Sequence, residues 1–204
     1  MEEPPPNTYP SSRSASSSCT TQMQRRQADR SNREGELPQL VLRIREARPD
    51  DARGVVHLLN SLIAGGAPIA FDGPFAETEE RAYIATFPER GVFLVALASD
   101  DALVGFQSLE PFAAYTHVFD HVGVIGTYVD AAHQRRGVAT QLFAATREAA
   151  KSKGYEKIFT YIREDNLGAL ATYQAHGFRI VGRADQHGKV NGQYVNVIIV
   201  ERRL

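Results

Sequence analysis

The residues that decide the fold run from 122 to 140 and read VGVIGTYVDAAHQRRGVAT. Their apolar first half predicts a strand over Val122–Val129. The polar turn Gln134-Arg135-Arg136-Gly137 leads directly into a pattern that predicts a helix over 137–153. A strand that passes through so short a turn brings the first amides of the helix to the strand's end, where they have no partner within the helix.

This turn predicts an anion site. The free amides lie at the positive end of the helix dipole, and Gly137 and Ala139 allow a ligand to approach the backbone closely. Phosphate is the common biological anion that fits such a turn. Arg135 and Arg136 add positive charge, and the hydroxyl of Thr140 can donate a hydrogen bond to a phosphate. Neither the Walker pattern nor the dinucleotide glycine pattern is present. The alternative is a merely solvated basic loop.

Outward from this stretch, the apolar patterns predict further strands and helices in a mixed order. The expected strands cover 41–45, 92–98, 103–109, 157–163, 178–183 and 194–200, and the expected further helices cover 49–64, 77–87 and 166–176. Together with the first strand and helix they predict a layered α/β (α+β) domain, with one central, partly antiparallel sheet of six to seven strands and about four helices.

Composition excludes several classes of protein. The chain has 204 residues, a formal net charge of -1 and a single cysteine, Cys19, so we expect neither a disulfide framework nor a nucleic-acid-binding field. The longest apolar run, 92–98, is far shorter than the roughly 20 residues of a membrane span. The first residues, 1–6, lack a basic and an apolar part, so we expect no secretory signal, no membrane partner and a cytoplasmic protein.

The first 40 residues differ in composition from the rest. They hold five of the ten prolines and seven serines, without Val, Ile, Phe or Trp. Such a segment cannot bury enough apolar surface to offset the entropy of ordering it, so we expect a disordered tail over 1–40 and one domain over 41–204. An organelle transit peptide is the alternative for its Ser/Arg-rich part.

Two motifs together resemble the GNAT superfamily of acetyl-CoA-dependent N-acetyltransferases. The family signature is Arg/Gln-x-x-Gly-x-Gly/Ala at the start of a helix, followed by an Asn and by a Tyr ahead of Gly-Phe. Gln134–Ala139 fills the first part, and Asn166 with Tyr173-x-x-x-Gly177-Phe178 fills the second. The segment 188–194 looks like the branch that contains phosphinothricin and small amino-acid acetyltransferases, and also like some ribosomal-protein acetyltransferases. The resemblance covers roughly 42–204 and implies the GNAT fold.

The resemblance implies a role for each matching residue. Residues of the turn and helix start would hold the coenzyme pyrophosphate, mainly by backbone amides: Arg135, Arg136, Gly137, Val138, Ala139 and Thr140. Thr127, Tyr128 and Val129 would pair with the pantetheine arm where two strands splay apart, and one backbone amide there would polarise the thioester carbonyl. Asn166 would contact the coenzyme, and Tyr173 would protonate the departing thiolate. No metal is required.

The general base and the acceptor stay open. Glu110 is the first candidate for the base, followed by His121 and Asp120, with a water relay as the alternative. The loops 64–75 and 110–121 are expected to form the acceptor pocket. The leading acceptor is the primary amine of a small amino acid or amino-acid-like compound. The alternatives are a protein N-terminus or lysine, and a non-catalytic acyl-CoA sensor. A homodimer is left open.

Deleting residues 1–40 is expected to leave the melting temperature and the turnover nearly unchanged, because these residues lack side chains that could join a core. Thermal unfolding and the rate of thiol release from acetyl-CoA measure both quantities. A loss of several degrees would mean that the segment packs on the domain and that the boundary is misplaced.

Overall fold

The computed structural model describes residues 40–71 and 73–204. The tail expected over 1–40 therefore lies outside the described residues except for Leu40. Both backbone groups of Leu40 form hydrogen bonds to the start of the helix region: its N–H donates to the carbonyl of Arg136 at 3.3 Å, and its carbonyl accepts from Gln141 Nε2 at 2.9 Å.

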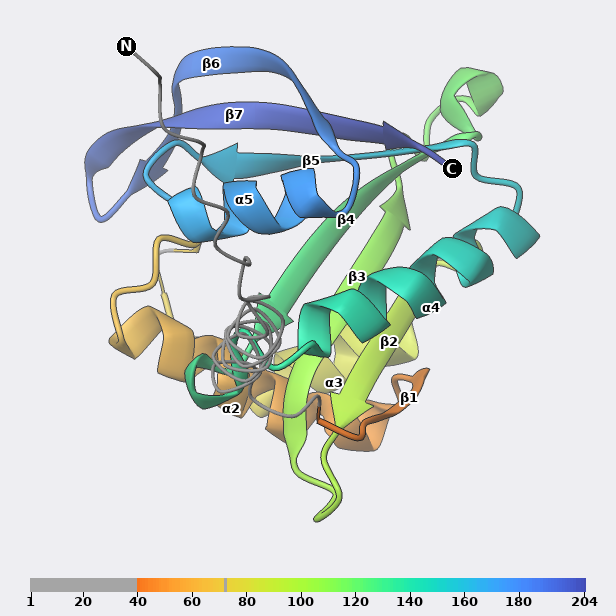
Figure 1. Ribbon diagram of the computed structural model, residues 1–204, viewed down its shortest axis with the longest axis vertical. Coiled ribbons are helices and arrows are strands. Elements are labelled where there is room, and N and C mark those ends of the chain that lie inside the picture. Colours follow the sequence, from red (N-terminus) through yellow and green to blue (C-terminus); the bar gives the residue numbers. More distant parts are fainter. Residues whose placement is uncertain (1–39, 72) are drawn as a thin grey trace, which may run out of the picture. The chain divides into compact units, whose positions relative to one another are not determined.

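A seven-stranded mixed sheet forms the centre of the domain, in the order β1-β2-β3-β4-β5-β7-β6 (Figure 1). Only β4 and β5 pair in parallel, and all other neighbours are antiparallel. The strands are β1 (Arg43–Glu46), β2 (Val92–Leu97), β3 (Leu103–Pro111), β4 (Val122–Val129), β5 (Lys157–Arg163), β6 (Arg179–Val190) and β7 (Gln193–Arg203).

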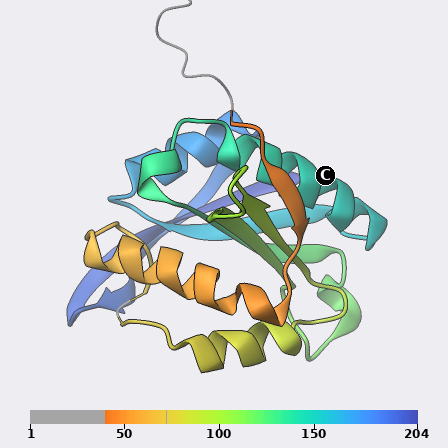
Figure 2. The ribbon, with the colours of Figure 1, turned by 90° about the horizontal axis from the view of Figure 1, so that it is seen from below.

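In the described part of the chain, four α-helices cover the two faces of the sheet. They are α2 (Ala52–Ala64), α3 (Glu77–Ala85), α4 (Val138–Ser152) and α5 (Leu167–Ala175), with short 3-10 turns η1 (Pro49–Asp51), η2 (His117–Phe119) and η3 (Ala131–His133). Figure 2 shows α2 and α3 on one side of the sheet and α4 and α5 on the other. The layered mixed fold expected from the sequence is confirmed. None of the helices in the described part of the chain has the length and apolar content that spanning a membrane demands.

Each face of the sheet has its own core. Under α2 and α3, buried side chains such as Val55, Leu59 and Phe106 pack against the inner strands. Under α4 and α5, the second core contains Leu142, Ile158 and Val200, each less than 4% exposed. Because both faces are covered, β2 is buried along its whole length and reads as a continuous apolar run.

The structure corrects some expected boundaries. The helix expected from Pro49 begins as a 3-10 turn and becomes α-helical only at Ala52. The largest difference is the hairpin of β6 and β7, which extends to a turn at Asn191-Gly192, where both residues have positive φ. Most of β6 is exposed, so its second half lacks the apolar alternation by which a half-buried strand is recognised in a sequence.

Gly105 on β3 sets how closely α4 approaches the sheet. A Cβ atom there would lie 2.8 Å from Val138 Cγ1 and 3.1 Å from the carbonyl oxygen of Tyr128. The absence of that Cβ therefore lets the first turn of α4 lie directly against β3, beside the end of β4.

We expect Gly105→Ala to lower the free energy of unfolding by about 1–3 kcal/mol, because an added methyl must displace the first turn of α4. Gly182→Ala on β6 is the matched control, since its Cβ would make an ordinary contact with Ile199 Cδ1 at 3.8 Å. Urea unfolding of the two variants measures the difference. Equal stabilities would show that α4 does not depend on the close approach.

Candidate active site

The strands β4 and β5 part after three residue pairs. They pair from Val122 opposite Lys157 to Val124 opposite Phe159, although β4 continues to Val129. On its other side β4 stays paired with β3 as far as Val129. Within the described residues, the edge of β4 from 125 to 129 that faces β5 thus has no strand partner. Since backbone amides and carbonyls need partners, this edge can pair with an extended ligand.

A cleft of about 660 Å³ opens at this fork. Its lining residues come from the end of β4, the turn before α4, the start of α4, one side of α5 and the loop after α2. Figure 1 shows where these elements lie in the fold. The lining residues are Leu62, Ala67, Pro68, Ile69, Thr127, Tyr128, Val129, His133, Gln134, Arg135, Gly137, Val138, Ala139, Thr140, Asn166, Gly168, Ala169, Thr172, Tyr173, Ala175 and His176. The structure therefore brings together ten of the twelve site residues expected from the sequence, and leaves out Arg136 and Glu110.

The turn before α4 forms a cradle of free amides. Arg135 and Gly137 both have positive φ, 58° and 83°, and Gly137 is the N-cap of the helix. The first backbone bond of the helix runs from the amide of Gln141 to the carbonyl of Gly137 at 3.1 Å. The amides of 138–140 therefore precede the hydrogen-bond ladder and lie at the positive end of the helix dipole. This arrangement suits a phosphate group.

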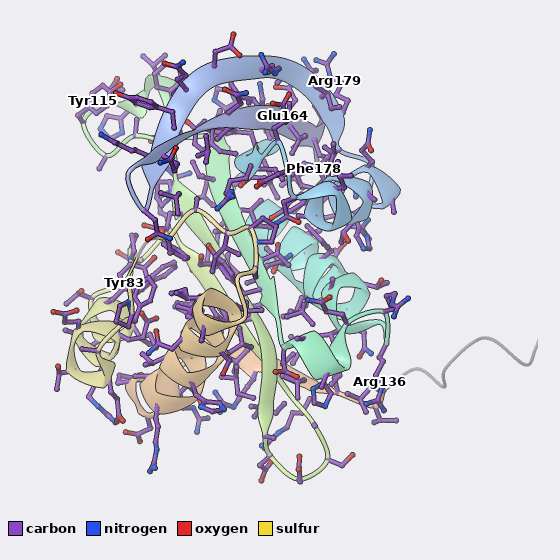
Figure 3. All side chains as sticks on the ribbon, turned by 90° about the vertical axis from the view of Figure 1, so that its left-hand side faces the viewer. Tyr83, Tyr115, Arg136, Glu164, Phe178 and Arg179 are labelled. Atoms are coloured by element: carbon purple, nitrogen blue, oxygen red, sulfur yellow. The ribbon has the colours of Figure 1, made fainter. Side chains whose placement is uncertain are left out.

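The two arginines of the turn differ in position. Arg135 is exposed and lines the cleft, whereas Arg136 is half-buried and lies on the outer side of the turn (Figure 3). The carbonyl of Arg136 is held by the amide of Leu40. Both arginines were expected to add positive charge to the site, but of the two only Arg135 lines the cleft.

Asn166 caps α5 and also holds the loop after α2. Its Oδ1 accepts from the amide of Ala169 at 3.0 Å, and its Nδ2 donates to the carbonyl of Pro68 at 2.9 Å. Arg163 adds a 3.3 Å bond from Nη1 to the carbonyl of Ile69. Loop 67–69 is therefore attached to the end of β5 and the start of α5, and closes one end of the cleft.

Tyr173 is 5% exposed and is one of the residues that line the cleft. Its ring packs edge-to-face on Phe143 and Phe178, with centroids 5.2 and 4.9 Å away. Its hydroxyl lies 2.8 Å from Thr127 Oγ1. Burial raises the pKa of Tyr173 to about 12, against the hydroxyls of Thr127 and Thr160, whose hydrogen bonds lower it. The phenol is thus protonated at neutral pH and can only give a proton away.

The three candidate bases are not among the described residues that line the cleft. Glu110 accepts a 2.6 Å hydrogen bond from the hydroxyl of Tyr83 on α3. Burial is the main cause that raises the pKa of Tyr83, and the hydrogen bond to the Glu110 carboxylate raises it further. Asp120 pairs with Arg90 at 3.1 Å, and His121 is exposed. A proton that travelled from the cleft to Glu110 would need a bridging water.

Sequence analysis missed Gln107 and His176. Gln107, in the middle of β3, is fully buried and donates to Thr127 Oγ1 at 2.9 Å. A polar residue between Phe106 and Leu109 in an otherwise buried strand is the signal that could have indicated it. His176 faces Thr140 across the cleft, and burial lowers its pKa. In the described part of the chain no three His, Cys, Asp or Glu residues gather as a metal site would require.

Comparison with known proteins finds similar sequences and structures over most of the chain. Residues 45–178 match the model of the acetyltransferase (GNAT) family. A phosphinothricin N-acetyltransferase of Streptomyces coelicolor is 25% identical over 80% of this chain and 96% of its own. An L-methionine sulfoximine/L-methionine sulfone acetyltransferase of Pseudomonas aeruginosa is 24% identical over 79% and 94%. The crystal structure of a phosphinothricin acetyltransferase from Sinorhizobium meliloti in complex with acetyl-CoA superposes with a TM-score of 0.72 at 18% identity, covering 80% of this chain and 88% of its own.

We expect Gly137→Val to weaken acetyl-CoA binding at least tenfold, on the order of 1.4 kcal/mol or more, because the side chain obstructs the amide cradle. Titration calorimetry measures the dissociation constant. Gly192→Val is the matched control, since Gly192 also has positive φ, 78°, but lies in the turn between β6 and β7. Both variants carry the same backbone strain, so an equal affinity in the two would contradict the phosphate cradle.

Proposed function

Because the chain belongs to the acetyltransferase (GNAT) family, we propose that it transfers the acetyl group of acetyl-CoA to the primary amine of a small amino acid or amino-acid-like compound. Membership of the family confirms the expected class, an acetyl-CoA-dependent acetyltransferase. The acceptor and the roles of individual residues are the proposal.

The observation that carries the proposal is the order of chemical groups along the cleft. The free amides of 138–140 lie at one end, the unpaired edge of β4 lies in the middle, and the hydroxyl of Tyr173 lies beside Thr127 where the strands part. A phosphate, an amide-bearing arm and a thioester follow one another in the same order in acetyl-CoA. The chain's groups thus fit this donor, which supplies the activated acetyl group.

Four groups of the cleft have distinct tasks in the proposed reaction. The amides of α4 and Arg135 bind the pyrophosphate, and the edge of β4 over 127–129 pairs with the arm. One amide on that edge stabilises the negative charge that develops on the thioester oxygen. As a neutral amine forms its bond to the carbonyl carbon and the C–S bond breaks, Tyr173 gives its proton to the sulfur. The amine gives its surplus proton to water. The proton either stays in the solvent or passes through a bridging water to Glu110.

The shape of the acceptor end supports a small acceptor. Loop 67–69 is held across it by Asn166 and Arg163. Phe71 stacks on Tyr128 with ring centroids 5.7 Å apart. The cleft wall at this end is thus made of a fixed loop and of Tyr128, whose ring is held from outside the cleft by Phe71, and such a wall suits a compact molecule better than a peptide chain. The compounds named for the relatives, phosphinothricin and methionine sulfoximine, are small and amino-acid-like.

A panel of amines tests the acceptor. Thiol release from acetyl-CoA is measured with phosphinothricin, L-methionine sulfoximine, the common amino acids, and peptides with a free N-terminus or lysine. We expect turnover with at least one small amino-acid-like compound and none with peptides. Turnover with peptides alone would identify a protein acetyltransferase, and binding of acetyl-CoA without thiol release would identify a sensor.

We expect Tyr173→Phe to lower kcat at least tenfold, because a general acid is typically worth ~10²–10⁴-fold and water can replace part of that contribution. The dissociation constant for acetyl-CoA is expected to change less than about threefold, since only a hydroxyl is removed. Tyr155→Phe is the matched control: Tyr155 is 2% exposed and donates to the carbonyl of Arg90 at 3.0 Å, outside the cleft. Full activity of Tyr173→Phe would make Tyr173 a core residue only.

A further inference from the structure

Four elements of the domain bring polar side chains to the point where β4 and β5 part. Gln107 on β3 lies directly opposite Thr127 on β4 in the strand register. Tyr173 reaches them from α5, and Thr160 comes from β5 on the far side of the fork. Gln107, Thr160 and Tyr173 are 0, 6 and 5% exposed. A buried polar cluster of this kind in an apolar core is costly unless its hydrogen bonds are made.

The chemistry of the groups sets the direction of the hydrogen bond from Gln107, and between Thr127 and Tyr173 either hydroxyl can donate. Gln107 Nε2 has only protons to give, so Thr127 Oγ1 accepts at 2.9 Å. The other described partner of Thr127 is the hydroxyl of Tyr173 at 2.8 Å. Thr127 has one hydroxyl proton, and the phenol oxygen is the acceptor within its reach. When the hydroxyls of Thr127 and Thr160 both donate to Tyr173, the phenol's own proton is left to the cleft.

We infer that Gln107 and Thr127 are positioning residues, which hold the oxygen of Tyr173 as an acceptor so that its proton points at the departing sulfur. The inference rests on the proposed role of Tyr173 as proton donor. When the C–S bond breaks, its electron pair stays on sulfur and takes the proton of Tyr173. The tyrosinate that remains keeps the hydrogen bond from Thr127 and regains a proton from water in the cleft.

The arrangement also stabilises the charge that appears on Tyr173. Hydrogen bonds from hydroxyl groups favour the phenolate, and burial opposes it. Without such donors, a phenol in an apolar pocket would be a weaker acid. Its hydroxyl proton would also have no fixed direction. Gln107 and Thr127 therefore act on the rate of proton transfer and leave the binding of acetyl-CoA to the backbone of β4 and α4.

A double-mutant cycle tests the inference. Thr127→Val removes the hydroxyl at nearly constant volume, and we expect it to lower kcat about fivefold or more, with the KM for acetyl-CoA changed less than threefold. In the Tyr173→Phe background the same change is expected to cost less than twofold, because no phenol remains to be positioned. Thr127→Ser restores the hydroxyl and is expected to keep at least half of the wild-type kcat.

Two further variants separate positioning from packing. Gln107→Leu removes the donor to Thr127, and its loss of kcat is also expected to disappear in the Tyr173→Phe background. Thr146→Val is the matched control, because Thr146 is 1% exposed and its Oγ1 has no partner in the described part of the chain. It is expected to leave kcat unchanged. Melting temperatures identify any variant that fails to fold.

The first readout is thiol release from acetyl-CoA with the best amine of the panel. The second is the slow hydrolysis of acetyl-CoA by water, because the same thiolate leaves in both reactions. Equal losses from Thr127→Val in both backgrounds, or full activity of Thr127→Val, would overturn the positioning role while Tyr173 remained the acid. Full activity of Tyr173→Phe would instead overturn the proton donor itself. Hydrolysis keeps the test independent of the acceptor.

Discussion

The separation of β4 from β5 after three residue pairs is the constraint on which the site depends. It divides the sheet into one half with β1, β2, β3 and β4 and another with β5, β7 and β6. Each half keeps its own pairing: β3 follows β4 to its end, and β7 follows β5 along its whole length. The fork is therefore a stable feature of the backbone, which leaves one strand edge free for a ligand.

The two halves contribute different chemistry to the fork. The turn and helix that suit a phosphate follow β4 and lie against β3 through Gly105. The tyrosine comes from α5, which follows β5. Thr127 and Tyr173 meet between the halves at 2.8 Å. A shift of one half against the other would alter the distance between the anion cradle and the proton donor. The core under α4 and α5 contains residues of both halves, and it therefore fixes the length of ligand that can react.

The sequence indicated the parts of the site that are local. The strand, the turn and the helix of 122–140 are adjacent along the chain, and the structure has a strand, a turn and a helix there with nearly the expected bounds. It did not indicate how distant segments meet. Glu110 was chosen for its place at a strand end, yet its carboxylate accepts from Tyr83 on α3. Gln107 was overlooked because its partner, Thr127, is set by the register of two strands.

Exposure limited the prediction of the hairpin in a similar way. β6 is the last strand of the sheet, and in the described part of the chain its outer edge pairs with nothing. Such an edge is a template on which a strand of another molecule can add, which is how many proteins aggregate. Charged groups stand along this strand at Arg179, Arg183, Asp185 and Lys189. The sequence predicted only the first half of β6, because the second half lacks an apolar pattern. An apolar pattern there would have made the strand easier to predict, and it would also have made the exposed edge more prone to pair with another molecule.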